Sequence, residues 1–171
     1  FVFLIVVNAI NFIDGIDGLA ITQVITIIIL IEFFSESLTE ISPIGTTIIL
    51  TLIPLYYFNF KKKGKVFLGD GGSMLLGTTI MIYILYVLGP RYTFVSNFKV
   101  NKVLFSVLVL IYPLTDLFRV FILRILKGKS PFIADKNHLH HKLNEVIKSQ
   151  LLTTLLITIL SLCLISIIII I

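Results

Sequence analysis

The chain has 171 residues, of which 57% are hydrophobic and only 13% are charged, with a formal net charge of +5. Its mean hydropathy is +1.08. Soluble domains are about 45–50% apolar and about 25% charged, so this composition excludes an ordinary soluble protein and indicates an integral membrane protein. A single cysteine, Cys163, excludes an intramolecular disulfide and a cysteine-based metal site. We expect the lipid bilayer as its surroundings and no nucleic-acid partner.

Apolar runs predict five or six membrane spans, because crossing the bilayer takes about 20 apolar residues. The runs are 1–13, 19–34, 44–60, 74–88, 103–126 and 151–171. The second and fourth are short unless their glycine-rich starts also lie within the membrane. Since a lipid-exposed backbone must satisfy its own hydrogen bonds, we expect one all-α, polytopic transmembrane helical bundle over residues 1–171. The first run looks cut mid-span, so we interpret the chain as the C-terminal part of a longer protein.

The distribution of basic residues predicts the orientation of the bundle. If the spans alternate, the loops near Asp14, Lys61 and His138 share one side, which carries 11 of the 14 Lys and Arg residues. The positive-inside rule places this side in the cytoplasm. Three motif-like segments, DGIDG, LGDGGS and HLHH, are therefore expected on one membrane face.

A polar stripe recurs at every third position of the first apolar run. It consists of Asn8, Asn11, Asp14 and Asp17. Such residues are costly in a membrane-grade segment unless they are functional. Steps of three place neighbours on adjoining parts of a helix surface, so Asp14 and Asp17 are expected within reach of one cation, beside glycines that let a ligand approach. The alternative is a helix end that turns polar where it meets water.

The segment LGDGGS follows four lysines and precedes an apolar helix. One interpretation of Asp70 is a helix N-cap. Gly71 and Gly72 would leave backbone N–H groups open at a helix start, which suits phosphate. The Asp70 carboxylate could instead hold a metal that bridges phosphate oxygens. The lysines would attract an anionic substrate or anionic lipid headgroups, or serve only as topology determinants.

All three histidines, His138, His140 and His141, fall within four residues. A zinc site is the first alternative, but HLHH lacks the i, i+4 pair of a metalloprotease helix and no cysteine can help. Histidines and nearby lysines, among them Lys136, can also donate hydrogen bonds to pyrophosphate oxygens. A surface turn without a role is the remaining interpretation.

The run at 103–126 contains Asp116 and Arg119 as an i, i+3 pair, with Arg124 near its cytoplasmic end. One interpretation is a mutually neutralised ion pair plus a snorkelling Arg124. The other is a positive group, Arg119, that lines a path to an anionic headgroup.

Carboxylates, glycine-rich turns and a histidine–lysine loop on one face indicate a divalent metal that neutralises a pyrophosphate. Mg²⁺ prefers oxygen ligands and commonly binds through one or two carboxylates plus phosphate. We therefore predict transfer of a phosphosugar or nucleotide onto a membrane-bound acceptor, where metal and cations stabilise the developing charge. Two other classes stay open: a cation transporter, which would place acids near mid-span, and an inactive membrane fragment.

These motifs resemble those of the polyprenyl-phosphate N-acetylhexosamine-1-phosphate transferases, glycosyltransferase family four. NAINFIDGIDGLA is similar to the family's N-x-x-N-x-x-D-G-x-D-G-L-A motif from Asn8 to Ala20, and FLGDGGS to its F-x-G-D-x-G-S motif. HLHH resembles the H-x-H-H form of the N-acetylglucosamine-phosphate branch. The muramoyl-pentapeptide branch, which is the alternative, carries three consecutive histidines.

The resemblance implies transfer of N-acetylglucosamine 1-phosphate from a UDP-sugar to undecaprenyl phosphate with release of UMP, the first membrane step of cell-envelope polysaccharide synthesis. It implies a multi-pass protein of the bacterial inner membrane with its active site facing the cytoplasm. The implied cofactor is Mg²⁺, with Mn²⁺ as a substitute. Whether the protein forms a homodimer stays open.

The motifs and the resemblance together assign roles to individual residues. The expected metal ligands are Asp70, Asp14 and Asn11. The expected catalytic residues are Asp14, Asp17, Asp70, His138, His140 and His141. The expected substrate-binding residues are Asn8, Asn11, Gly72, Ser73, Arg119 and Lys136. This chain departs from the family in one respect that matters. The family has an adjacent aspartate pair in an earlier loop and more spans, whereas this chain contains no Asp-Asp dipeptide and five or six predicted spans. We therefore expect this chain alone to lack transferase activity.

Overall fold

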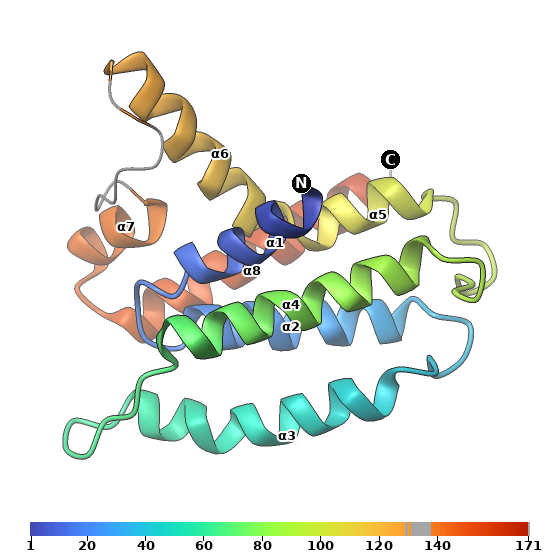
Figure 1. Cartoon of the computed structure of the whole chain (residues 1–171), viewed down its shortest axis with the longest axis horizontal. Helices are drawn as coiled ribbons and strands as arrows, with labels where there is room; N and C mark the ends of the chain where they lie inside the picture. The colour runs from blue at the N-terminus through green and yellow to red at the C-terminus, as the bar shows by residue number, and fades with distance from the viewer. Residues whose placement is uncertain (129, 131–137, 171) are drawn as a thin grey trace.

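The computed structural model describes residues 1–128, 130 and 138–170, and these fold into helices joined by short turns and loops (Figure 1). The helices are α1 (Val2–Phe12), α2 (Leu19–Phe33), α3 (Ser42–Asn59), α4 (Gly69–Leu88), α5 (Lys102–Val109), α6 (Ile111–Leu126), α7 (Leu139–Ile147) and α8 (Gln150–Ile170). An isolated antiparallel bridge joins Ser35 and Phe94. The predicted all-α class is therefore confirmed.

Two helices, α4 and α8, are each long and apolar enough to cross a membrane, and α5 with α6 would make a third span. The helices α1 and α2 are apolar but have only 11 and 15 residues. The 18 residues of α3 include an internal Pro54 and several polar side chains. These helices are those of a multi-pass membrane protein, and the shorter ones occupy the other predicted runs.

The glycine-rich segment before the fourth apolar run is part of helix α4. The run was expected to begin at Met74, but the helix begins at Gly69, whose φ of +68° suits glycine. This adds the turn that the run lacked and brings the helix to 20 residues. The N-cap position belongs to Leu68, so the N-cap interpretation of Asp70 is wrong and its carboxylate lies in the first helical turn.

The run at 103–126 does not form one continuous helix. It breaks at Leu110, and α5 and α6 meet at an angle of 73°. Pro113 lies in the first turn of α6, where its missing N–H costs little, whereas inside a continuous helix it would remove a hydrogen bond to the preceding turn. Figure 1 shows α6 leaving the bundle, and Phe118, Ile122 and Leu126 on it are exposed.

The core of the bundle lies where α1 packs along α4. Ile10 and Ile80 are fully buried there. The two helices approach closely at Gly77, where an added Cβ would lie 2.8 Å from the Cα of Val7. This approach determines how near the polar end of α1 comes to the start of α4.

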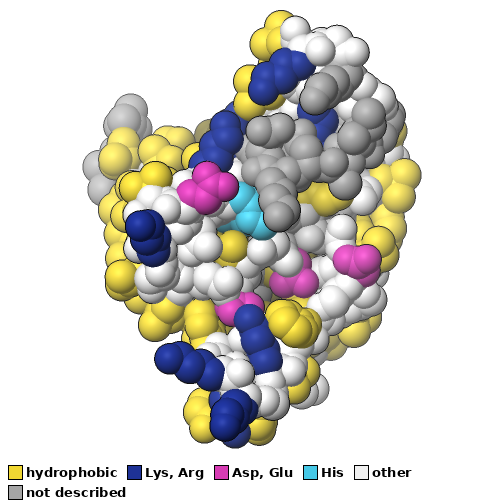
Figure 2. All heavy atoms as spheres, turned by 90° about the vertical axis from the view of Figure 1, so that its left-hand side faces the viewer, with side chains coloured by type: hydrophobic (Ala, Val, Ile, Leu, Met, Phe, Trp, Pro, Cys, Tyr) yellow, Lys and Arg dark blue, Asp and Glu magenta, His cyan; other side chains and the backbone are white. Residues whose placement is uncertain are grey.

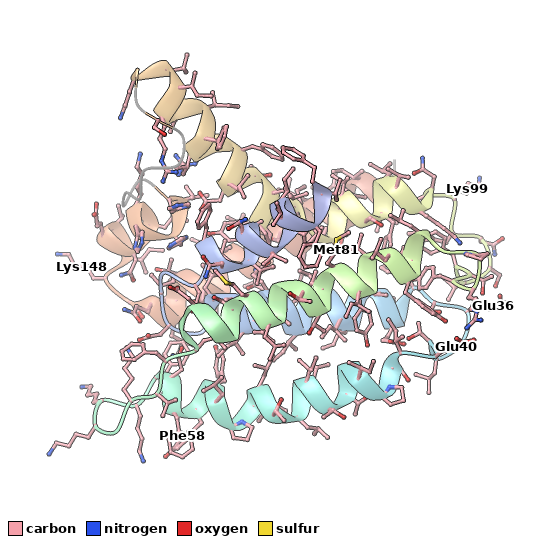
Figure 3. All side chains as sticks on the ribbon, in the orientation of Figure 1. Glu36, Glu40, Phe58, Met81, Lys99 and Lys148 are labelled. Carbon is pink, nitrogen blue, oxygen red and sulfur yellow. The ribbon has the colours of Figure 1, made fainter. Side chains whose placement is uncertain are left out.

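The two ends of the bundle differ in composition. One end carries Glu36, Glu40 and Lys99, and the opposite end carries Lys148 (Figure 3). At the Glu36 end, the Val95 N–H donates to Phe34 O at 3.0 Å, which joins the loop after α4 to the loop after α2. At the Lys148 end lie the 13–18 turn, the 60–68 loop and α7, so the three motif segments share one end as alternation predicted.

Candidate active site

The acidic half of the polar stripe lies in a turn rather than on a helix. Helix α1 ends at Phe12, and residues 13–18 reverse the chain into α2. Gly18 has a φ of +75°, a conformation that permits this reversal. The helical placement expected for Asp14 and Asp17 is therefore wrong. Asn8 remains on α1, where its Nδ2 donates to Leu4 O at 2.7 Å.

Asn11 connects the end of α1 to the start of α4. Its Nδ2 donates to Ser73 Oγ at 2.8 Å and lies 3.4 Å from Asp70 Oδ1. Ser73 is fully buried, and its hydroxyl donates to the backbone oxygen of Asp70 at 3.1 Å. The polar stripe and the LGDGGS segment thus meet through residues 59 and 62 positions apart.

Asp14 lies among carboxylates. Burial, together with the negative charges of Asp70 and then Asp17, raises the pKa of Asp14 from 3.8 to about 7. Such a group of like charges stores repulsion that a divalent cation would relieve. The oxygens of Asp14, Asp70 and Asn11 are the ligand type that Mg²⁺ prefers, so these residues fit the metal that the motifs imply.

The turn that carries Asp17 is held by residues from three other segments. Its carboxylate pairs with Lys65 from the 60–68 loop. From α8, Gln150 Oε1 accepts the Asp17 N–H at 3.1 Å, and Thr154 Oγ1 donates to Asp17 O at 3.1 Å. The Gly18 N–H donates to Asn59 Oδ1 at 2.6 Å. The lysine run was expected to act as a group, and nothing in its spacing distinguishes Lys65.

The histidine segment is anchored to α6 by Asp116. His138 Nδ1 lies 2.8 Å from Asp116 Oδ2, and the Leu139 N–H donates to Asp116 Oδ1 at 2.7 Å. His138 is 6% exposed and His140 is fully buried. The interpretation of HLHH as a surface turn is therefore wrong, because two of its three histidines lie inside the protein.

The histidine segment meets the acidic turn at Gly15. A Cβ added there would lie 2.3 Å from His140 Nε2 and 2.9 Å from His141 Nε2. Figure 2 looks onto this end of the molecule and shows histidine and acidic side chains on one face, with Lys and Arg around them. Acids, histidines and cations from segments far apart in the sequence are thus gathered at one end.

Other predicted site residues have different surroundings. Arg119 lies 3.2 Å from Asp116, which agrees with the ion-pair interpretation. Arg124 is only 5% exposed, so the snorkelling interpretation is wrong for it. Gly72 lies in the first turn of α4, against the side chain of Leu68. Lys136 lies outside the described residues.

A second group could hold a metal by geometry alone. Ligand atoms of Asp116, His138 and His140 all lie within 4.8 Å of one another. However, both Asp116 oxygens already accept hydrogen bonds, and the Arg119 guanidinium adds a positive charge beside them. This chemistry favours a hydrogen-bonded Asp–His group over a cation site, and it leaves the carboxylates near Asp14 as the better place for Mg²⁺.

Comparison with known proteins agrees with these motifs. A decaprenyl-phosphate N-acetylglucosaminephosphotransferase of Mycobacterium leprae (strain TN) is 34% identical over 89% of this chain and 42% of that protein. A probable undecaprenyl-phosphate N-acetylglucosaminyl 1-phosphate transferase of Bacillus subtilis (strain 168) is 31% identical over 81% of this chain and 37% of its own length. An undecaprenyl-phosphate alpha-N-acetylglucosaminyl 1-phosphate transferase of Escherichia coli (strain K12) is 29% identical over 79% of this chain and 36% of its own length.

The chain thus spans roughly two fifths of the length of these curated relatives, 36% to 42%. No solved structure matches it. Residues 1–88, just over half of the chain, match the family described as glycosyl transferase family 4. These residues include the 13–18 turn with its aspartates, the 60–68 loop with its lysines and all of α4. The chain therefore belongs to glycosyl transferase family 4.

Proposed function

We propose that the protein to which this chain belongs transfers N-acetylglucosamine 1-phosphate from UDP-N-acetylglucosamine to undecaprenyl phosphate and releases UMP. The observation that carries the proposal is the meeting of three motifs at one end of the bundle. Asn11 contacts Asp70 and Ser73, and Gly15 lies against His140. The names of the relatives support both the sugar and a polyprenyl phosphate acceptor.

The reaction exchanges one phosphorus–oxygen bond for another. A phosphate oxygen of the lipid attacks the sugar-bearing phosphorus of the UDP-sugar and forms a new P–O bond. The bond from that phosphorus to the bridging oxygen breaks, and UMP leaves with the electron pair. The lipid then carries a diphosphate-linked sugar, which supplies cell-envelope polysaccharide synthesis.

The described residues offer complementary groups for such a substrate. Asp70, Asp14 and Asn11 would hold Mg²⁺, which neutralises diphosphate charge when bound. The first turn of α4 contains Asp70, Gly71 and Gly72, and its N–H groups lack partners within the helix, so they suit phosphate oxygens.

Cations and histidines complete the proposed substrate environment. Lys65 lies beside Asp17, and His140 faces Gly15, so both stand at the edge of the acidic turn. Histidine N–H groups and the lysine ammonium can donate to diphosphate oxygens. In this proposal the acids bind the metal while these groups orient the substrate and stabilise the charge on the leaving UMP.

We also propose that this end faces the cytoplasm of a bacterial cell, in the inner membrane. The positive-inside rule supports this orientation, because alternating spans would put 11 of the 14 Lys and Arg residues on this side. A cytoplasmic site would have access to the soluble UDP-sugar, and its position at the end of a membrane bundle would suit the phosphate of a lipid acceptor.

The test is UMP release from UDP-N-acetylglucosamine plus undecaprenyl phosphate by the intact protein, with and without Mg²⁺. Wild type is compared with Asp70→Asn and with Glu40→Gln, which neutralises an exposed carboxylate paired with Arg91 at the opposite end. Mg²⁺-dependent release that collapses only in Asp70→Asn supports the proposal. Activity only with UDP-muramoyl-pentapeptide would assign the protein to that branch, and no release with any UDP-sugar would refute the transferase function.

A further inference from the structure

We propose that Asp116 is a positioning residue for the transfer reaction: it holds the HLHH segment on α6 and determines which nitrogen of His138 carries the proton. The predicted effect of Asp116 on kcat rests on the proposed function, whereas its effect on the protonation of His138 does not. The juxtaposition behind it is direct, because the Asp116 carboxylate is 1% exposed and contacts the histidine segment at two points.

The two oxygens of Asp116 have different partners. Oδ1 accepts the Leu139 N–H at 2.7 Å and lies 3.2 Å from the Arg119 guanidinium, so both of these partners are donors. Oδ2 lies 2.8 Å from His138 Nδ1 and 3.6 Å from His140 Nδ1. Because a carboxylate can only accept, the short contact assigns the proton of neutral His138 to Nδ1 and leaves Nε2 as an acceptor.

His140 lies next to this contact and turns its other nitrogen toward the acidic turn. Its Nδ1 is 3.4 Å from the hydroxyl of Tyr112, and its Nε2 is buried without a hydrogen-bond partner among the described residues. That Nε2 is the atom that a Cβ on Gly15 would meet. Asp116 therefore contacts His138 directly and lies behind His140, whose far nitrogen borders the proposed substrate site.

An Asp116→Asn substitution separates this role from simple packing. The amide oxygen of Asn would keep the Leu139 N–H and Arg119 contacts, because both need an acceptor. Its NH₂ group would then face His138 Nδ1, which must become the acceptor, so the proton moves to Nε2. Size and burial stay nearly constant while the tautomer of His138 reverses.

The experiment uses ¹⁵N-histidine NMR of the intact protein in bilayers, with His138 assigned by loss of its signal in His138→Gln. We expect a protonated Nδ1 on neutral His138 in wild type and a protonated Nε2 in Asp116→Asn. The matched control is Glu32→Gln, which neutralises a partly buried carboxylate that accepts from Thr39 Oγ1 at 2.6 Å and Thr39 N–H at 3.2 Å. This control should leave the histidine spectrum unchanged.

UMP-release kinetics on the same three proteins complete the test. For Asp116→Asn we expect kcat to fall about 10- to 100-fold with little change in KM, as is typical when a partner of a functional histidine is lost. An unchanged tautomer, or a kcat equal to that of Glu32→Gln, overturns the proposal. If Asp116→Asn does not fold, the wild-type spectrum alone still tests the proposal, because a neutral His138 protonated on Nε2 would overturn it. Failure of the transferase function itself would show as an inactive wild type with an unaltered NMR result.

Discussion

Gly15 and His140 lie so close that any side chain at position 15 would collide with the imidazole, since a Cβ would be 2.3 Å from Nε2. We predict that Gly15→Ala displaces His140 and lowers kcat about 100-fold, because a shift near 1 Å in a catalytic group has an effect of this size. The measurement is UMP release by the purified intact protein, with thermal unfolding to confirm that the bundle remains folded.

A double substitution distinguishes this collision from other effects of alanine. In a His140→Ala background the closest contact of the new Cβ is gone and the contact with His141 Nε2 at 2.9 Å remains, so adding Gly15→Ala should cause a smaller further loss than in wild type. Equal multiplicative losses in both backgrounds would show that the two positions act independently and would contradict the contact.

Gly77 determines how closely α1 and α4 approach. We predict that Gly77→Ala destabilises the protein by about 1–3 kcal/mol, as overpacking of a core does, because the new Cβ would meet the Cα of Val7 at 2.8 Å. Backbone atoms cannot rotate away, so the helices must separate and Asn11 must withdraw from Ser73. Denaturant unfolding in detergent measures the loss, and a stability equal to wild type would contradict this packing.

The raised pKa of Asp14 predicts a pH-dependent stability in the absence of divalent cations. The folded protein holds a proton on Asp14 up to a pH of about 7, whereas the unfolded chain releases it near 3.8. The unfolded state therefore binds fewer protons across this window, and stability falls as pH rises through it and levels off above about 7. Thermal unfolding with a chelator should show this decline in wild type and a smaller one in Asp14→Asn.

The same shift predicts how metal binding depends on pH. Below a pH of about 7 a cation must displace the Asp14 proton, so the apparent Mg²⁺ affinity should increase with pH and then become constant. Proton release on titration with Mg²⁺ measures the exchange. An affinity that stays flat from pH 5 to 8 would show that Asp14 is not a ligand.

Lys65 is the one member of the lysine run for which a contact with an acid of the site is seen in the described structure. We predict that Lys65→Gln weakens UMP release while destabilising the fold by no more than about 1 kcal/mol, because a partly exposed ion pair contributes little to stability. Lys62→Gln, in the same loop, is the control for net charge. Equal losses in both variants would indicate that the loop acts only through its overall charge.

The helical class and most helix positions could be predicted from hydrophobic runs, because lipid leaves the backbone few alternatives. Two of the errors arose where one residue changed the outcome. A single proline, Pro113, lies just after the break in the run at 103–126. Gly69 starts α4 five residues before the apolar run does, because a helix can continue through glycines that an apolar pattern excludes.

The candidate site could be predicted in its composition but not in its connections. The motifs identified Asp14, Asp70 and the histidines from residue type and spacing. The partners of Asp17 could not be found in this way, since Gln150 lies 133 residues further along the chain and Gln and Thr are ordinary residues at a helix start. Asp116 was recognised as part of an ion pair, but its contact with His138 depends on how α6 tilts away from the bundle.

The attachment of the acidic turn to α8 has a consequence for biogenesis. A ribosome delivers the turn at Asp17 long before Thr154, its partner 137 residues later. Until α8 inserts, the turn lacks both of its α8 hydrogen bonds, and its carboxylates remain close together with fewer restraints. Maturation of the site is thereby delayed until α8 has been made, and a nascent chain arrested before α8 would hold every acidic residue of the motif without the support that orders them.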